Sequence, residues 1–294
     1  MQFSKLFGNK KEDKPIPKTQ RDGEPDVYHP PTEDDRIIWG IEKARLTLHY
    51  FEECLKQPKE GQDFFSIKVK IVDGKYAEHI WLTEPNFDEE GNLYGVVGNE
   101  PLNVKTVKLN QNIGIDRALV TDWMLVQEGR LIGGYTIRAI REGLTAEDLK
   151  RFDEDFGIII DDGEDYFSAD FTTPEGAILC IENAYDEKNI PKILACKDFH
   201  IEAQLMAQKK RGFYHPETIH ELSRVLELSC IKYFNDNVFP SFTGVIRAFP
   251  KREQVSSKHV IITEVVYYSD GSECRQRINT YHTENGWRVL HPED

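Results

Sequence analysis

The stretch that decides the fold of the first half of the chain is DWMLVQEGRLIGGYTIR, which runs from Asp122 to Arg138. Residues 123–126 predict a strand, Glu128-Gly129 a hairpin turn, and residues 130–132 the returning strand. Gly133-Gly134 lets the backbone turn sharply where a Cβ would clash. Apolar residues at helical spacing follow, so we expect a short amphipathic helix laid back on the sheet.

The sequence before this stretch predicts one helix and several short strands. Acidic residues at 33–35 favour a helix start, and apolar residues recur every three or four positions as far as Leu55. Pro58 and Gly61 end that helix. Alternating polar and apolar residues at 65–71 then predict a half-buried strand, and Asp73-Gly74 a hairpin turn. Residues 34–145 therefore predict a compact α+β domain with a strongly curved antiparallel sheet.

Two other segments differ in composition from this domain. Residues 1–33 are rich in Lys, Asp, Glu and Pro, and their small apolar surface predicts a flexible N-terminal arm. Residues 146–171 are strongly acidic and are expected to connect two domains, with a short helix begun by Thr145.

Residues 172–294 predict a second α+β domain with helices first and an antiparallel sheet afterwards. Thr173-Pro174 supplies a cap and a first-turn proline for the first helix. A second helix is expected over 190–208, with a division near Asp198, and a third over 216–235. Asp270-Gly271 and Asn285-Gly286 are strong hairpin signals between the later strands.

Composition narrows the classes of function. The 294 residues carry a net charge of −14, which disfavours nucleic acid and allows a basic protein partner. The five cysteines are scattered, as is typical of reduced thiols in a cytoplasm. No run approaches the length of a membrane span, and no signal peptide is evident. We therefore expect a cytoplasmic protein that does not contact membranes.

An ordered series of motifs in residues 36–144 resembles the bacterial YegJ-like family, domain of unknown function 2314. The series consists of IEKAR at 41–45, FSIKV at 65–69, EHIWL at 78–82, VGNEP at 97–101, DWM at 122–124 and GGYT at 133–136. This resemblance implies a fold and little about activity.

Residues 172–294 resemble the nuclear-transport-factor-2-like superfamily, in which a cone of helices surrounds a curved sheet. The resemblance rests on TPEGA at 173–177, AYDEKN at 184–189, YSDG at 268–271 and ENGWRV at 284–289. The superfamily includes enzymes, ligand binders and dimerisation modules, so this resemblance implies no single activity.

The first domain offers five candidate binding residues. Residues 78–81 lie on one strand, so His79 and Trp81 share a face. They suit acid–base work or ligand stacking, but a solvated histidine beside a core tryptophan is the commoner arrangement. Glu100 is expected in a turn that could face His79. Trp123 is either an interface anchor or a core residue whose ring N–H meets the backbone, and Arg138 is a weak anion-binding candidate.

The second domain offers five more, on adjacent strands of its sheet: His259, Glu264, Tyr268, Arg277 and Tyr281. Only every second residue of a strand points to one face, and the sequence leaves open which set does. Glu264 lies in an otherwise apolar strand. It predicts either a catalytic acid with a raised pKa or a carboxylate paired with Arg275 or Arg277, and we favour the pair.

No phosphate loop, dinucleotide fingerprint, zinc-protease motif or nucleophile elbow occurs, so we expect no cofactor, no metal and no catalytic residue. The leading hypothesis is a non-catalytic protein that binds a protein partner or a small ligand, with an acidic inhibitory or immunity-type role as one version. The alternatives are an enzyme that acts on a small molecule in the C-terminal cone, and a homodimer formed through the sheet at 259–290.

Overall fold

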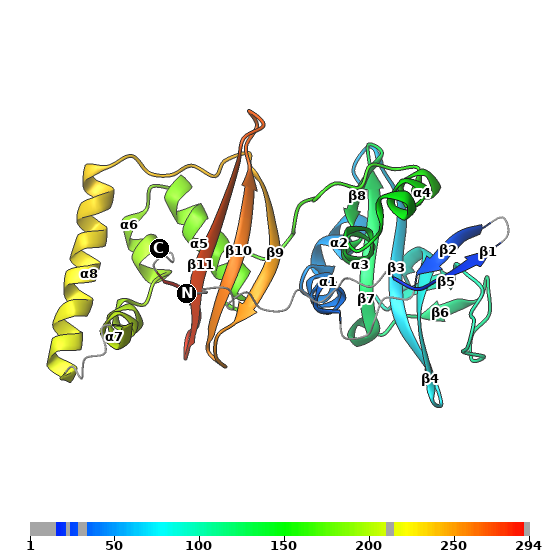
Figure 1. Cartoon of the computed structure of the whole chain (residues 1–294), viewed down its shortest axis with the longest axis horizontal. Helices are drawn as coiled ribbons and strands as arrows, with labels where there is room; N and C mark the ends of the chain where they lie inside the picture. The colour runs from blue at the N-terminus through cyan, green and yellow to red at the C-terminus, as the bar shows by residue number, and fades with distance from the viewer. Residues whose placement is uncertain (1–15, 22–23, 29–33, 210–214, 291–294) are drawn as a thin grey trace, which may run out of the picture. The chain divides into compact units, whose positions relative to one another are not determined.

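The computed structural model describes residues 16–21, 24–28, 34–209 and 215–290. The chain divides into two compact units, Met1–Asp162 and Gly163–Asp294. Each unit combines helices with an antiparallel sheet (Figure 1), so the predicted α+β class with two domains is confirmed. Among the described residues, no helix is long and apolar enough to cross a membrane.

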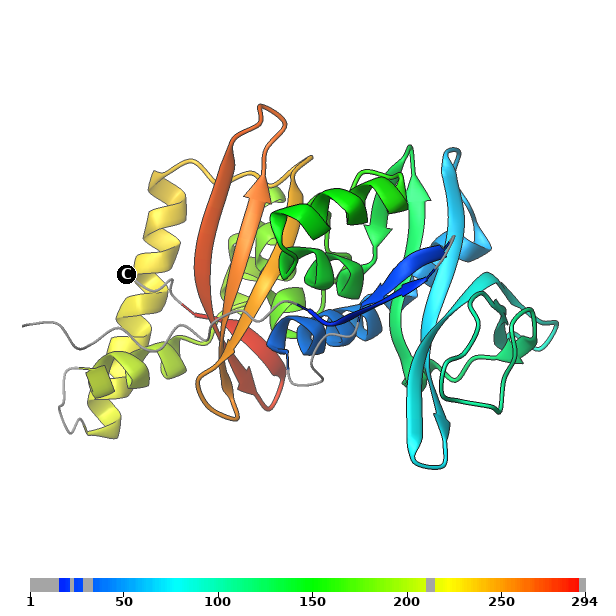
Figure 2. The same cartoon turned by 45° about the vertical axis from the view of Figure 1, so that its right-hand side comes forward.

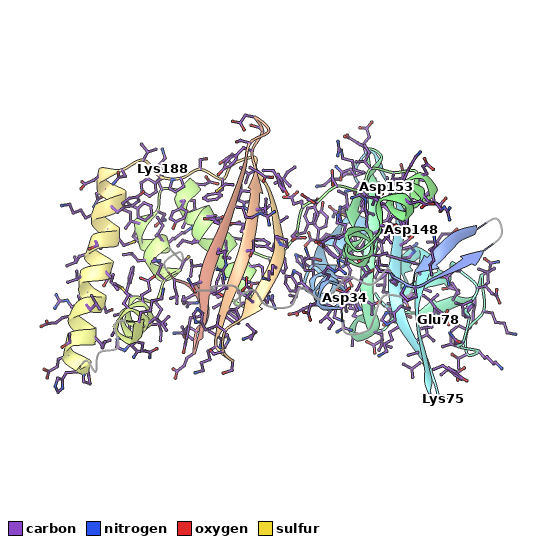
Figure 3. The ribbon with its side chains drawn as sticks, viewed as in Figure 1. Asp34, Lys75, Glu78, Asp148, Asp153 and Lys188 are labelled. Atoms are coloured by element: carbon purple, nitrogen blue, oxygen red, sulfur yellow. The ribbon has the colours of Figure 1, made fainter. Side chains whose placement is uncertain are left out.

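The first unit contains a six-stranded antiparallel sheet in the order β6-β5-β4-β3-β7-β8. The longest strands form the β3–β4 hairpin, coloured blue to cyan in Figure 2, and Lys75 lies in the turn at its tip (Figure 3). The strands are β3 (Gln62–Asp73), β4 (Tyr76–Phe87), β5 (Leu93–Val97), β6 (Asn112–Gly114), β7 (Val120–Gln127) and β8 (Arg130–Gly133).

The described α-helices of this unit are α1 (Asp35–Leu46), α2 (Leu48–Lys56), α3 (Tyr135–Glu142) and α4 (Ala146–Phe156), and a short 3-10 helix, η1 (Arg117–Leu119), precedes β7. The single helix expected before the sheet is divided at Thr47, which is fully buried and whose hydroxyl donates to the Lys43 carbonyl over 2.7 Å. The sharp turn at Gly133-Gly134 is confirmed, since both residues have positive φ. A Cβ on Gly133 would lie only 2.5 Å from Trp123, so the glycine is required there.

The expectation of a flexible arm over residues 1–33 is wrong for part of that segment. Strands β1 (Lys18–Arg21) and β2 (Glu24–Tyr28) form an antiparallel hairpin. Ile16 is buried in a cluster with Ile37 and Ile140, and Lys18 pairs with Asp148 over 2.7 Å. Apolar burial and a charge pair therefore offset the ordering entropy of this hairpin. Residues 1–15, 22–23 and 29–33 lie outside the described residues.

The acidic segment 146–171 is not a simple connector. Its first part forms α4, whose Phe152 is buried in the core of the first unit. Asp148 and Asp153 project from α4 (Figure 3), and Asp153 pairs with Arg141 over 2.7 Å. The Leu131 amide donates to the Ile159 carbonyl over 2.9 Å. The division between units therefore falls after Asp162 rather than at residue 145.

The second unit begins with α5 (Pro174–Asp186), α6 (Ile190–Ala195), α7 (Phe199–Lys209) and α8 (Pro216–Asp236). A four-stranded antiparallel sheet follows in the order β12-β11-β10-β9. Its strands are β9 (Ile246–Gln254), β10 (His259–Tyr267), β11 (Glu273–Thr283) and β12 (Gly286–Val289). The predicted hairpin turns are confirmed, with Gly271 and Gly286 at φ 83° and 91°.

Helix α5 covers one face of this sheet, while α8 packs against α7 (Figure 1). The Thr173 hydroxyl accepts from the Gly176 amide, and Pro174 occupies the first turn, as the sequence predicted. Ala177, Ile178, Ile181 and Ala184 form the buried apolar side of α5. Two acidic residues, Glu175 and Glu182, are buried on the same helix, and they shape the polar interior described below.

Candidate functional site

Trp123 is a core residue of the first unit. Its side chain is fully buried, and its ring N–H donates to the Ala44 carbonyl over 3.1 Å and to the Thr47 hydroxyl over 3.2 Å. Its ring also packs edge-on against Tyr135, with 5.6 Å between centroids. A buried tryptophan with a satisfied N–H is the structural alternative that the sequence offered, and it leaves no surface for an interface anchor.

The preceding residue, Asp122, is also fully buried and holds the start of α3. Its carboxylate accepts hydrogen bonds from the Tyr135 amide (3.1 Å), the Thr136 amide (2.9 Å) and the Thr136 hydroxyl (2.5 Å). Burial raises the pKa of Asp122, whereas the Lys68 cation and the hydrogen bonds from Thr136 act in the opposite direction. Asp122 therefore anchors the positive end of a helix to the sheet.

Lys68 of β3 lies between Trp81 of β4 and Asp122 of β7. The strand register places it directly opposite Trp81 on β4 and Asp122 on β7. Its ammonium is 5.2 Å from the centroid of Trp81 and 3.4 Å from the Thr136 hydroxyl. Burial lowers the pKa of Lys68, and the Asp122 charge partly offsets that effect. Lys68 is thus half-buried, with Thr136 of α3 beside its ammonium group.

His79 and Glu100 are not brought together by any contact in the described residues. His79 Nδ1 lies 3.0 Å from the Thr121 hydroxyl. Partial burial of the ring, followed by the charges of Lys68 and Lys70, lowers the pKa of His79, so the ring is neutral at pH 7. In the turn that contains Glu100, backbone amides donate instead to the Glu78 carboxylate, as at Leu102 over 2.9 Å.

Arg138 is engaged within the first unit. Its guanidinium donates to the Leu131 carbonyl over 2.6 Å and to the Asp161 carbonyl over 2.8 Å. These bonds tie α3 to the strand β8 and to the end of the unit. The anion-binding role considered for Arg138 therefore competes with two internal contacts.

In the second unit, the strand register separates the predicted residues into two sets. His259 lies opposite Tyr281, and Thr263 lies opposite Arg277, so these residues share one face. His259 Nε2 contacts the Asn279 side chain over 2.8 Å, and the Arg277 guanidinium donates to Glu253 over 3.3 Å. None of these side chains faces Glu264, which lies on the other side of the sheet.

The expected pairing of Glu264 with Arg275 or Arg277 is wrong. Glu264 lies opposite Gln276, whose amide donates to it over 2.6 Å, and the neighbouring arginines point to the opposite face. A shift of one residue in register would have made the expected pair, which the sequence could not exclude.

Instead, Glu264 forms an acid pair with Glu182 of α5. Both residues are almost fully buried, and a side-chain hydrogen bond joins them. Arg247 of β9 donates to Oε2 of Glu182 over 2.5 Å. Within the described part of the chain, no nitrogen or hydroxyl donor contacts Oε1 of either glutamate. Burial raises the pKa of both carboxyls, so the two share a proton, and the pair with Arg247 is close to neutral.

Two further observations define this interior. Glu175, two helical turns before Glu182, pairs with Arg252 over 2.7 Å, so α5 is joined to β9 by two buried ion pairs. Tyr268 lies just after β10 on the acid-pair side. Burial, and then the charges of Cys274, Glu182 and Glu264, raises the pKa of Tyr268. Of the predicted residues, Glu264 and Tyr268 are thus brought to one region.

Sequence reasoning did not identify Lys68, Glu182 or Arg247 as site residues. One signal for Glu182 was available, because it lies four positions after Ile178 on the apolar side of α5. Arg247 had no comparable signal, because its partner is 65 residues away in the sequence.

A pocket of about 200 Å³ lies beside Arg247 in the second unit. It is formed where the segment before α5 meets α5 and β9. In the described residues, no group of three His, Cys, Asp or Glu side chains is placed to hold a metal ion. The pocket is lined by Glu164, Asp165, Tyr166, Phe167, Ala169, Leu179, Asn183 and Arg247.

Comparison with known proteins gives matches to bacterial sequences. A protein of Neisseria meningitidis serogroup B named "Putative ankyrin repeat protein" is 31% identical over 180 residues, which cover 58% of this chain and 65% of that protein. The "Uncharacterized protein YegJ" of Escherichia coli K12 is 34% identical over 98 residues, which cover 33% of this chain and 62% of YegJ. The chain thus spans less than two thirds of either relative. No solved structure matches it.

The family comparison concerns the first unit. Residues 34–160 match the family described as "Uncharacterized protein conserved in bacteria (DUF2314)". That range includes α4, in agreement with the packing of the acidic segment into the first unit. The resemblance of residues 172–294 to the nuclear-transport-factor-2-like superfamily is not confirmed by these comparisons. Residues 34–160 of this chain therefore match the bacterial DUF2314 family, and the resemblance of this part to YegJ is confirmed.

Proposed function

We propose that this chain is an acidic, cytoplasmic binding protein whose partner is a basic protein, and that it acts without catalysis. The proposal rests on the distribution of acidic and basic residues in the chain. In the second unit, the buried ion pairs Glu175–Arg252, Glu182–Arg247 and Glu202–Lys197 each remove one acidic and one basic residue from the surface. Because each of these pairs is neutral, the net charge of −14 arises from other residues of the chain, and the part of that surplus that is exposed attracts cationic partners over long distances.

Capture at two ionic strengths tests this proposal. The full chain, immobilised and exposed to a bacterial lysate at about 0.05 M salt, should retain proteins of high isoelectric point. These should be released near 0.5 M salt, because that concentration screens interactions between exposed charges. Retention of mainly acidic or neutral proteins, or retention that salt does not weaken, would contradict it.

A second candidate, an enzyme, is favoured by the Glu182–Glu264 pair. Two buried carboxyls that share a proton can provide a general acid and a general base. However, the side chains are 2% and 0% exposed, so a substrate could reach them only if α5 moved away from the sheet. Hydrogen exchange of α5 amides measures that opening. Exchange as slow as that of the central strand β10 would count against the enzyme.

As a third candidate function, we propose that the chain forms a homodimer through its C-terminal sheet. β9 and β12 are the outer strands of the sheet, and Arg277 is exposed on the face opposite the acid pair. An outer strand offers backbone groups to a second copy. Sedimentation of the full chain at increasing concentration should show a dimer, and a monomer throughout would reject this arrangement.

A further inference from the structure

The pocket of the second unit has a fixed wall. Asp165 is attached to β9 at two points, because its amide donates to the Arg247 carbonyl over 2.9 Å and its carboxylate accepts from the Phe249 amide over 2.7 Å. These bonds hold the segment 164–167 along the strand. Glu164, the residue immediately before, is half-buried and is thereby positioned at the pocket.

The charge of the pocket is negative. Its cationic residue, Arg247, is directed inward, where it donates to Glu182 over 2.5 Å and to the Phe242 carbonyl over 3.3 Å. The acid pair behind the wall thus balances the charge of Arg247. Glu164 and Asp165 are the acidic residues of the lining, and the Asp165 carboxylate is engaged by the Phe249 amide. Burial raises the pKa of Glu164, whereas a side-chain hydrogen bond with Tyr166 and the charge of Arg247 act in the opposite direction. A cation would therefore be favoured in this pocket over an anion.

The other lining residues narrow the kind of cation. Tyr166 and Phe167 contribute aromatic rings, which attract organic cations, and Leu179 contributes an apolar surface. The side-chain amide of Asn183 supplies a further polar group. A volume of about 200 Å³ is smaller than that of most drug-sized sites, so it suits a single side chain or a short alkylamine. Lysine combines an alkyl stem with an ammonium group.

We propose that this pocket receives the ammonium group of a lysine side chain on a basic partner, with Glu164 as the residue that pairs with it. The inference rests on the proposed function, because it names the place where a basic partner is recognised. It adds a defined site, a residue and a ligand chemistry that a general surface charge would not provide.

The test uses the full chain and Nα-acetyl-lysine methylamide as the probe, with Nα-acetyl-norleucine methylamide as its uncharged counterpart. Binding is followed by NMR shifts of residues 164–183. The lysine probe should bind about tenfold more tightly than the norleucine probe, because a charge-assisted hydrogen bond contributes that much. Glu164→Gln should abolish the difference, and the matched control Glu84→Gln, at an exposed site in the first unit, should retain it.

Equal binding of the two probes, or an undiminished preference in Glu164→Gln, would overturn the inference. If Glu164→Gln does not fold, Asn183→Leu provides the second variant and should weaken lysine binding at least threefold. The two proposals fail in different ways. Salt-dependent capture of basic proteins without a lysine preference would reject only the pocket. A lysine preference without such capture would reject the wider function.

Discussion

Replacement of Glu182 by Gln should remove a pH dependence from the stability of the second unit. Glu182 and Glu264 face each other in the interior, and Arg247 supplies one positive charge beside them. At neutral pH the folded unit therefore retains a proton that the unfolded chain releases. The pKa of Glu182 is raised in the folded state, so its contribution to stability is complete below the ordinary value of 4.5 and is lost as the pH rises toward the folded pKa.

The size of this pH dependence follows from the one proton that the folded unit retains and the unfolded chain releases. Each pH unit within that window lowers the free energy of unfolding by about 1.36 kcal/mol, so from pH 6 to pH 8 the wild type should lose about 2.7 kcal/mol relative to Glu182→Gln. The amide of the glutamine can donate to Glu264 and needs no proton from solvent. Other groups titrate in both proteins and cancel in the difference.

The assay must report on the second unit alone, because a chain with two units need not unfold in one step. Urea unfolding at pH 6, 7 and 8 is followed by pulse hydrogen exchange at one fixed labelling pH, with peptides from α5 and β10 as reporters. Glu187→Gln, at the exposed end of α5, is the matched control and should keep the wild-type slope. Parallel pH profiles for wild type and Glu182→Gln would refute the shared proton.

Three further outcomes are expected. Trp123→Ala should cost about 3–5 kcal/mol in denaturant unfolding of the first unit, since a large buried aromatic is lost, and a cost below about 1 kcal/mol would contradict its core position. Asp122→Ala should destabilise the first unit by about 3–5 kcal/mol, because Lys68 and the start of α3 lose a buried partner, and preserved α3 amide protection in hydrogen exchange would contradict that. Limited proteolysis should spare residues 146–160, because α4 packs through Phe152, whereas early cleavage there would restore the idea of an acidic connector.

The predictions that succeeded depended on local chemistry. Gly133-Gly134 turns sharply because glycine adopts positive φ without strain, and the double glycine is visible in the sequence. The hairpin turns at Gly271 and Gly286 follow from the same freedom of the backbone. Such features need no knowledge of the distant parts of the chain.

The pairing of Glu264 with Glu182 could not be predicted, because it depends on distant parts of the chain. Whether Glu264 meets an arginine or Glu182 is decided by which face of β10 it occupies, and a shift of one residue reverses that choice. The short helix begun by Thr145 was predicted, but its packing into the first unit was missed, although Leu149, Phe152 and Phe156 recur at helical spacing and formed a usable signal. The acidic composition therefore led to the wrong prediction of a connector, whereas the apolar periodicity indicated a helix that packs against a core.

The most direct test of the binding function is the ionic-strength dependence of association with a captured basic partner. The rate constant for association should fall by at least tenfold between about 0.02 and 0.5 M salt, because the exposed negative surplus accelerates encounter only while it is unscreened. The dissociation rate should change much less. An association rate that is unchanged across this range would contradict the proposal that the acidic surface of this chain selects its partner.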